Sequence, residues 1–566
     1  MSKTQTIDER IEQTFPAPDF RPKQKAAIRE VVKGIEGDAD VTILDAPTGA
    51  GKSLILYTAM AVVNGEGFFT TPLNSLVDQL DEDEFIAPNV IAMKGRNNYE
   101  CIHPEDEGES VDQAICQRDQ NFECEFKENS CPYYSKKKAA INHPNAVTNM
   151  SYIMAESMIP RTEENEEWVF GDRDTLVVDE CQKIEDFAMS FISFTVSKYT
   201  VPDDVWYNID LPKQKMEDDM DFLVEWVEGE LMETVKEAIS RMDSANILGK
   251  DENKDLENLK QFKLRVDNFL KDVKENDWIA DIDWEIKKNR PNEQKIVFKP
   301  IIIGRFLDSF LWSRADNIVL SSATVPGGNW LEEIGLGGKS VKHVSVPSQF
   351  PIENRPIMTK FDVGKMTYNE RDDNMWPMAK RIKAIADHYD GDKGFIHCRS
   401  YSLAESLKRS FQNHKATEDN PFDESPRQWF KENCMVQDRD RREESLEAWK
   451  ENDKQLFFSV AMDEGIDLEG DLCRFQILAK VLYGSMNDRR TEYRIKQRND
   501  WDWYNRKAAV QIQQAYGRGV RSAEDWCHFY LLDSSAKGLI KRNEGLFQSW
   551  FLEAIQDMDV DPSKGM

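Results

Sequence analysis

Residues 46–53 read Ala-Pro-Thr-Gly-Ala-Gly-Lys-Ser; they follow the apolar run Val41–Asp45 and open a helical pattern that continues to about Asn64. A glycine-rich turn between a strand and a helix is the context of a phosphate-binding P-loop. The glycines let backbone N–H groups turn toward phosphates, and the helix N-terminus adds positive potential. Ala46 stands where the strict pattern has glycine. We expect a nucleotide site in which Lys52 reaches the β- and γ-phosphates and Ser53 holds Mg²⁺, with Thr48, Gly49 and Gly51 lining the loop.

A second apolar strand, Thr175–Asp179, ends in the acidic pair Asp179-Glu180. Alone, such a pair is a weak signal because acidic pairs are common on protein surfaces. Downstream of a P-loop it indicates the other half of a nucleotide-hydrolysing site. Asp179 would bind Mg²⁺, and Glu180 would orient and deprotonate the attacking water.

A third motif, residues 514–521, reads Gln-Ala-Tyr-Gly-Arg-Gly-Val-Arg. Two arginines three residues apart on a helix share one face, where they can stabilise charge on a transferring phosphoryl group. For this segment alone an exposed basic helix turn is the simpler interpretation, but the two preceding motifs favour the catalytic one. We therefore expect Gln514, Arg518 and Arg521 to act together with Lys52 and Glu180.

Strand and helix patterns alternate on both sides of a long insertion, which predicts parallel sheets covered by helices. Residues 190–300 differ, because Met216–Lys274 is rich in Glu, Lys, Leu and Met at helical spacing and predicts an inserted helical domain. Val346–Arg355, with three Pro and Asn positions, predicts a linker. The further strand and helix candidates are Gly67–Thr71, Ser75–Leu80, Ile318–Leu320, Gly394–His397, Leu456–Val460, Phe475–Ala479 and His528–Leu532.

The chain has 566 residues, of which 40% are hydrophobic and 31% charged, with a net charge of −30. At roughly 150 residues per domain, this length predicts about four domains. A protein this acidic does not bind nucleic acid over its whole surface, so any such binding needs local basic grooves. The polar segment Met1–Arg10 argues against a secretory signal, and the apolar stretch Leu54–Val63 is too short for a bilayer span. We expect a soluble intracellular protein without membrane contact.

Four of the nine cysteines cluster, with the spacing Cys101-x14-Cys116-x7-Cys124-x6-Cys131. A tight group of four in an intracellular protein indicates a metal site rather than disulfides. Four thiolates can hold Zn²⁺ or a [4Fe–4S] cluster. The absence of paired C-x2-C knuckles favours iron–sulfur, while zinc and free thiols remain alternatives. In either metal case the site would staple a small domain that has little core of its own.

Together these motifs resemble those of superfamily 2 helicases, and more closely the XPD/DinG family of iron–sulfur DNA helicases. Phe20–Gln24 resembles the family's adenine-reading motif, with Gln24 as the candidate residue, and Thr70–Leu76 resembles motif Ia. Lys94–Cys101 resembles the Lys-Gly-Arg-x-Asn-Tyr-x-Cys segment that leads into the cluster, and Cys131–Tyr134 resembles the segment that follows it. The remaining matches are Asp179–Gln182 with Asp-Glu-Ala-His, Leu320–Thr324 with motif III, Glu464–Leu468 with motif V and Gln514–Arg521 with motif VI.

The resemblance, which spans about residues 20–535, implies an α/β fold with two RecA-like P-loop motor domains. It also implies a small Fe–S cluster domain and a helical arch domain, both inserted in the first motor domain. The expected boundaries are motor domain 1 at 1–95, 141–190 and 300–345, the cluster domain at 96–140, the arch at 191–299, and motor domain 2 at 346–566.

The resemblance further implies an ATP-dependent DNA helicase that uses Mg²⁺, moves 5′→3′ on single-stranded DNA and unwinds forked or tailed duplexes in repair, recombination or replication. We expect a monomer located in the cytoplasm or nucleoid, or in the host cytoplasm if the protein is viral. The candidate DNA contacts are Thr71, Arg96, Tyr99, Arg399 and Ser400.

Charge and one altered motif leave room for a second interpretation, a DNA-stimulated translocase or remodelling module that does not unwind. Residues 100–128 carry ten carboxylates, which suits a DNA path poorly. We expect these carboxylates to face solvent. We expect the DNA strand to be faced instead by Lys94, Arg96, Tyr99 and Lys136–Lys138. Cys181 and Gln182 replace the family's Ala and His; Gln can still donate and accept hydrogen bonds, so we expect hydrolysis to survive.

Overall fold

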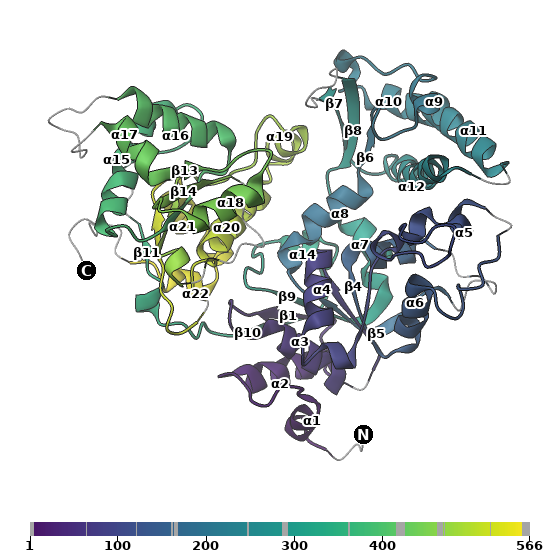
Figure 1. The fold of residues 1–566 in the computed structure, drawn as a ribbon, viewed down its shortest axis with the longest axis horizontal. Coiled ribbons are helices and arrows are strands. Elements are labelled where there is room, and N and C mark those ends of the chain that lie inside the picture. Colours follow the sequence, from purple (N-terminus) through teal and green to yellow (C-terminus); the bar gives the residue numbers. More distant parts are fainter. Residues whose placement is uncertain are drawn as a thin grey trace.

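The computed structural model describes residues 5–63, 65–119, 122–159, 162, 168–245, 248–285, 293–359, 363–414, 425–460, 468, 470–520 and 522–556. Two α/β domains lie side by side in Figure 1. The first contains the N-terminal part of the chain, and the second, coloured green to yellow, lies at left. Each contains a sheet in which every pairing of strands is parallel. No helix among the described residues combines the length and apolar character needed to cross a membrane.

The first domain is built on a seven-stranded sheet of order β10-β1-β9-β5-β2-β4-β3. Successive residues of its strands point to opposite faces, so Val41, Ile43 and Phe68 enter one core while Leu44 and Phe69 enter another. The elements are α1 Ile7–Thr14, α2 Gln24–Ile35, β1 Val41–Asp45, α3 Lys52–Val62, β2 Gly67–Thr71, α4 Asn74–Glu82, β3 Ile91–Met93, α5 Ile115–Arg118, α6 Pro132–Asn142, β4 Asn145–Asn149, α7 Met150–Ser157, β5 Arg173–Val178, α8 Ile184–Ile192, α13 Gly304–Phe310, β9 Ala315–Ser322, α14 Trp330–Glu333 and β10 Val341–Ser345.

The second domain follows the linker and has a six-stranded sheet of order β11-β16-β15-β12-β14-β13. The predicted strands at 394–397, 456–460, 475–479 and 528–532 are all present, to within one residue at their ends. Its elements are β11 Ile357–Met358, α15 Arg371–His388, β12 Gly394–His397, α16 Tyr401–Asn413, α17 Pro426–Asn433, β13 Cys434–Val436, α18 Arg442–Glu451, β14 Leu456–Ser459, β15 Phe475–Leu478, α19 Arg489–Lys496, α20 Trp501–Tyr516, β16 His528–Leu531, α21 Ser535–Arg542 and α22 Ser549–Leu552.

The insertion between α8 and α13 is mixed rather than wholly helical. Three helices lie within the predicted helical stretch: α10 Met220–Trp226, α11 Met232–Asp243 and α12 Lys250–Asp272. The short helix α9 Asp203–Trp206 precedes that stretch. They pack beside an antiparallel sheet of order β6-β8-β7, with β6 Phe194–Val196, β7 Trp278–Glu285 and β8 Glu293–Pro300, which the sequence analysis does not predict. The signal is present in β7, whose Trp278, Ala280 and Ile282 alternate with the acidic Asp281 and Asp283.

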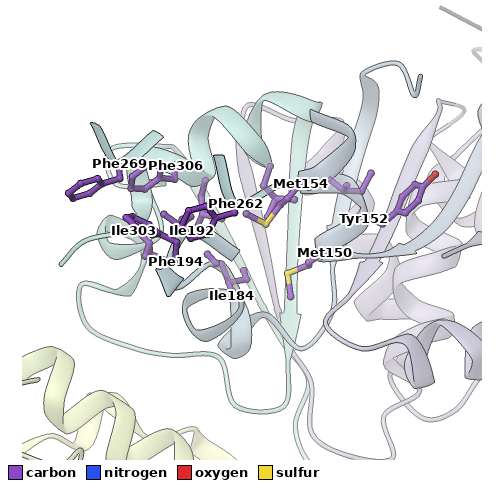
Figure 2. Packing of buried hydrophobic residues seen from close by; sticks show 14 of the residues in the cluster. Met150, Tyr152, Met154, Ile184, Ile192, Phe194, Phe262, Phe269, Ile303 and Phe306 are labelled. Atoms are coloured by element: carbon purple, nitrogen blue, oxygen red, sulfur yellow. The ribbon is translucent and has the colours of Figure 1, made fainter. Parts of the chain in front are cut away.

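The insertion and the first domain share one hydrophobic core. Figure 2 shows this core running from Met150 and Met154 in α7, past Ile184 and Ile192 in α8, to the phenylalanines of the insertion. Phe194 is its centre in the insertion, stacked on Phe298 with ring centroids 4.6 Å apart and touching Phe262 and Phe269 edge-on. Helix α8 is therefore the rigid connection between the sheet of the first domain and the insertion.

We expect Phe194→Ala to destabilise this half of the protein by about 3–5 kcal/mol, because a buried aromatic side chain would be replaced by a cavity. Urea denaturation followed by circular dichroism would measure the first unfolding transition. The control is Tyr207→Ala, since Tyr207 is 67% exposed. Equal unfolding midpoints for the two variants would contradict the shared-core interpretation.

Candidate functional site

The candidate site lies at the carboxyl ends of the central strands of the first sheet. The chain leaves β1 into residues 46–53, leaves β5 into Asp179, and leaves β9 into Ala323 and Thr324. Since β1, β9, β5 and β2 are consecutive in the sheet, their carboxyl ends meet at one edge, where parallel α/β sheets bind ligands.

The loop between β1 and α3 has P-loop backbone geometry. Gly49 and Gly51 have φ values of 85° and 74°, which L side chains rarely adopt. Gln24, fully buried, donates a hydrogen bond of 3.3 Å to the Gly51 carbonyl, and Arg21 donates one of 2.7 Å to the Gly49 carbonyl. Thr48 and Ser53 line the cavity that the loop borders. Gln24, expected to read a nucleotide base, thus also supports the loop.

Lys52 joins the loop to the acidic pair. Its ammonium donates to Glu180 Oε1 at 2.8 Å and lies 3.7 Å from Asp179 Oδ1. Burial alone would raise the pKa of Glu180, but the charge of Lys52, together with hydrogen bonds from Lys52 and Gln182, lowers it to about 2. Burial raises the pKa of Asp179. Lys52, Asp179 and Glu180, three of the predicted site residues, therefore lie together, and Glu180 is ionised.

The backbone at Glu180 is in the left-handed region, with φ 52°, which costs free energy for a residue with a side chain. This turn aims the carboxylate back at Lys52, and the Glu180 N–H donates to Asp179 Oδ1 at 2.9 Å. Gln182 donates to Glu180 Oε2 at 2.7 Å, while its own buried Oε1 has no hydrogen-bond partner among the described residues. Cys181 is buried in the core beneath.

The second domain closes the site from the opposite side. A cavity of about 540 Å³ lies between the domains, lined by Lys52 and Glu180 on one wall and by Gln514 and Arg518 on the other. Arg518 does not lie on a helix as predicted, because α20 ends at Tyr516 and glycines flank Arg518 in the following turn. Arg521 lies outside the described residues, as do Glu464–Asp467 of the motif V segment.

A buried amide supports the turn that carries Arg518. With its oxygen toward Gly519, the side chain of Gln476 accepts from the Gly519 N–H at 3.2 Å and donates to the Ala515 carbonyl at 3.0 Å and to His397 Nε2 at 2.9 Å. A Cβ at Gly519 would collide with Cys527 Sγ, so the turn packs closely on the start of β16. Gln476 carries no motif signal in the sequence; only the folded sheet places it here.

The linker also enters the site. The Phe350 ring covers the P-loop, where a Cβ at Gly49 would lie 2.5 Å from its Cζ atom. Arg355 is buried and donates to the carbonyls of Phe350 and Trp550 at 3.0 and 2.6 Å. The sequence analysis treats this segment only as a connection between domains.

The candidate DNA contacts fall in three separate places. Thr71 is buried at the cavity wall and donates to the Leu73 carbonyl at 3.1 Å. Arg96 and Tyr99 lie beside the cysteine segment, both against the ring of Tyr133. Arg399, with φ 63°, precedes α16, and the Ser400 hydroxyl caps that helix by accepting from the Leu403 N–H at 3.1 Å. Of the five, Thr71 alone lines the nucleotide cavity as far as the structure describes it.

Two expectations about charge in the cysteine region are wrong for particular residues. Lys137 does not face outward toward a DNA strand; it is buried, and its ammonium lies 2.6 Å from the Glu156 carboxylate. Asp106 does not face solvent; it is 2% exposed and receives a 2.8 Å bond from Arg118. A buried charge requires an opposite charge beside it, and these pairs supply one. Lys136 is also paired, with Asp81 at 2.8 Å.

The four clustered cysteines differ in burial. Cys101 and Cys131 are buried and Cys116 packs against the same core. Burial raises the pKa of the Cys116 thiol, and the charges of Cys124, Cys101 and Cys131 raise it further. Four thiols are, by their chemistry, a donor set that fits a thiolate-bound metal. Within the ranges that the structure describes, however, no three His, Cys, Asp or Glu side chains are arranged to hold a metal ion.

Asp45, at the end of β1, directly precedes the P-loop segment and belongs to no sequence motif. Burial raises the pKa of its carboxyl to about 7, although Ser345 and the charge of Lys52 act in the opposite direction. One carboxyl oxygen is buried without a hydrogen-bond partner in the described part of the chain. Asp45 therefore carries a proton at neutral pH in an appreciable fraction of molecules.

Comparisons with known proteins agree with this geometry. The family described as "Helicase C-terminal domain" matches residues 384–554, and the family described as "Type III restriction enzyme, res subunit" matches residues 17–193. The two matches contain the two walls of the cavity. The "ATP-dependent DNA helicase DinG" of Photobacterium profundum is 25% identical over 284 residues, which are 46% of this chain and 37% of the relative. The chain thus spans just over a third of that relative's length.

Two solved structures share the fold over nearly the whole chain. One, described as "XPD_Helicase", has a TM-score of 0.59 and 17% identity, covering 94% of this chain and 99% of the other. The second, "Structure of S. tokodaii Xpd4", has a TM-score of 0.56 and 14% identity, covering 95% and 99%. These neighbours confirm the predicted α/β fold with two RecA-like domains. Together with the family matches and the relative, they confirm the resemblance to XPD/DinG-like superfamily 2 helicases.

We expect Asp45→Asn to stabilise the protein at pH 8 and to have little effect below pH 4. The folded-state pKa of about 7 exceeds the ordinary value of 3.8. The folded state therefore binds the proton more tightly, and wild-type stability falls as pH rises between these values. The gain at pH 8 is at most about 4 kcal/mol. Denaturant titration of both proteins across this range would measure it, and a pH-independent difference would contradict the assignment.

Proposed function

We propose that this protein is an ATP-dependent DNA helicase of the XPD/DinG type that moves 5′→3′ on single-stranded DNA and unwinds forked or tailed duplexes. The observation that carries the proposal is the cavity where Lys52 and the Asp179-Glu180 pair face Gln514 and Arg518 across two parallel-sheet domains. Such an arrangement can hydrolyse a nucleoside triphosphate only when both domains contribute, which is what a two-domain motor requires.

The residues of the first domain would bind and activate the reactants. Lys52 would exchange Glu180 for the phosphates of ATP, because phosphate oxygens offer the ammonium more negative charge than one carboxylate. Ser53 and Asp179 would hold Mg²⁺, which supplies charge neutralisation at the phosphates when bound. Glu180, once released by Lys52, would orient the attacking water and accept its proton.

The residues of the second domain would complete the site on closure. Gln514 lies at the end of α20, and Arg518 in the next turn, so both move with this domain. Arg518, and Arg521 in the same motif, would stabilise the charge that develops on the transferring phosphoryl group. Hydrolysis would then release the second domain, and a DNA strand held across both domains would advance. The proposed contacts to that strand are Thr71, Arg96, Tyr99, Arg399 and Ser400.

A [4Fe–4S] cluster held by Cys101, Cys116, Cys124 and Cys131 is part of the proposal, with Zn²⁺ as the alternative. Four thiols are a donor set that suits a shared metal or cluster, which supports this part of the proposal. A bound cluster would supply a staple for residues 96–140, whose buried apolar residues are few. Cys101 and Cys131 would transmit that constraint to the core of the first domain, where they are buried.

The proposed setting is DNA repair, recombination or replication, with the protein acting as a monomer in the cytoplasm or nucleoid. A second candidate function is a DNA-stimulated ATPase that translocates or remodels without unwinding. Gln182 favours this alternative, because its neutral amide hydrogen-bonds Glu180 where the related family has a titratable His.

We expect Lys52→Ala and Glu180→Gln each to lower ATP hydrolysis by about 10³-fold or more, because each removes a group that contacts the reacting atoms. Steady-state phosphate release with single-stranded DNA present would measure it. Lys33→Ala, an exposed lysine in α2, is the matched control. A wild-type rate in either site variant would refute the assignment.

Strand separation by anaerobically purified protein with Mg²⁺-ATP tests the function itself. Duplexes would carry a 5′ tail, a 3′ tail or no tail. Unwinding only from the 5′ tail is the expected result. ATP hydrolysis stimulated by single strands, with no unwinding of any duplex, would instead establish the translocase alternative.

We expect Cys116→Ser to lower the iron and acid-labile sulfide content and to impair unwinding while leaving ATP hydrolysis measurable. The cysteine does not line the ATP cavity, so its loss affects the cluster region first. Metal analysis and visible absorption would be compared with Cys434→Ala, a buried cysteine of the second domain. Zinc without sulfide would establish the alternative metal, and unimpaired unwinding by Cys116→Ser would contradict a structural role.

A further inference from the structure

Glu185 is a buried carboxylate at the interface between the two motor domains. It lies in the first turn of α8, five residues after Glu180, and its side chain is 5% exposed. Its Oε1 atom accepts from the Arg490 guanidinium at 3.0 Å and from the Trp503 indole N–H at 2.8 Å. Its Oε2 atom lies 3.4 Å from the Lys507 ammonium. All three partners belong to α19 and α20 of the second domain.

The charged groups around Glu185 are cations, which are complementary to its carboxylate. Burial alone would raise its pKa, but Lys507, Arg490 and Arg494 hold the pKa well below its usual range. The rings and guanidinium groups also stack, with Arg494 centred 4.4 Å and Arg490 5.2 Å from the ring of Trp503. Removing the charge of Glu185 would leave the buried cations around it without a compensating negative charge. This cluster is therefore sensitive to loss of the Glu185 charge.

Neighbouring contacts dock the same two helices on the first domain. Arg490 donates to the Ile301 carbonyl at 2.8 Å, and Arg494 donates to Glu333 at 2.6 Å. Arg506 donates to Asn329 at 2.5 Å. In Figure 1, α19 projects from the second domain toward α8 and the insertion. Glu185 is the acceptor that joins α19 and α20 at one point.

Helix α20 links this point to the ATP cavity. It runs without interruption from Trp501 to Tyr516, so Lys507 near its middle and Gln514 near its end move as one body. On the other side, Glu185 is one turn beyond Gln182, which bonds Glu180. The carboxylate therefore connects the segment that carries Glu180 with the helix that delivers Gln514 and Arg518.

We propose that Glu185 is a positioning residue that sets α20 against the ATP-binding domain and so places Gln514 and Arg518 for hydrolysis. This inference rests on the proposed function, because it concerns how that site is assembled. Glu185 is not one of the described residues that line the cavity, and it acts through Arg490, Trp503 and Lys507.

Glu185→Gln keeps the shape of the side chain and its ability to accept from Trp503, and removes only the charge. We expect the DNA-stimulated kcat for ATP to fall about tenfold or more with KM changed less than about twofold, since α20 supplies interactions used mainly in the transition state. Glu185→Asp, which keeps the charge, should recover part of kcat. An unchanged kcat in Glu185→Gln, or a raised KM with unchanged kcat, would overturn the inference.

A matched control is an exposed ion pair between the second domain and the insertion, Arg498 with Asp277 at 3.3 Å. Arg498→Gln should leave kcat unchanged, because exposed pairs contribute little. If Glu185→Gln does not fold, Trp503→Phe removes one hydrogen bond at the same point and should lower kcat in the same direction.

Hydrogen exchange of the full chain tests the docking without relying on activity. In Glu185→Gln the amides of α19 should exchange faster than in the wild type, while Arg498→Gln should show wild-type exchange. Unchanged exchange in Glu185→Gln would overturn the inference whatever the kinetics. A wild-type protein without DNA-stimulated hydrolysis would instead contradict the proposed function, and the exchange result would still decide the role of Glu185.

Discussion

The contact of one ammonium with two carboxylates at the edge of the first sheet determines how the rest of the site is organised. Lys52 lies 2.8 Å from Glu180 and 3.7 Å from Asp179, all three largely buried. With both carboxylates ionised, this largely buried group would have a net charge of −1, so it needs further positive charge. The P-loop N–H groups, the helix N-terminus of α3 and Arg518 across the cavity surround it with positive potential. The site is therefore pre-arranged for a ligand that brings both negative phosphates and a cation.

The strained turn at Glu180 and the direction of α8 follow from that contact. Because Glu180 is turned back toward Lys52, the chain leaves β5 in a sharp bend and enters α8 within four residues. One face of α8 then packs Ile184, Ala188 and Ile192 into the core shared with the insertion. Glu185 on another face meets the second domain. A single short helix thus connects the ATP site with both the insertion and the second domain.

The sequence was sufficient to predict the strands and site residues that belong to a local motif. It was insufficient for residues whose roles depend on partners that the fold brings from distant positions in the chain. The P-loop, the Asp179-Glu180 pair and the strands Gly67–Thr71 and Gly394–His397 are each specified by adjacent residues, and the structure places them as expected. Gln476 and Asp45 are strand residues without unusual neighbours in sequence, and Glu185 resembles any acidic residue of a first helix turn. Their roles arise from residues far away along the chain, such as Ser345, which is 300 positions from Asp45, and Trp503, which is 318 positions from Glu185. The helix expected to carry Arg518 ends early because Gly517 and Gly519 disfavour it, a local signal that the motif resemblance outweighed.

Gln182 and Glu185 differ in the charge that they bring to the segment after β5. A histidine could change its charge with pH or with its partner, whereas the amide of Gln182 is neutral in every state and donates to Glu180 at 2.7 Å. Its buried Oε1 has no partner among the described residues, so it can gain a donor when the domains close. The cations around Glu185, one turn further, hold the pKa of its carboxyl well below its usual range, and this carboxylate already contacts the second domain. The segment 180–185 therefore contains two different contacts. The neutral amide of Gln182 lies next to the reacting carboxylate and can gain a hydrogen bond, whereas Glu185 makes an ionic contact with α19 and α20. In this arrangement the ionic contact, rather than the residue at position 182, carries the larger electrostatic interaction between the domains.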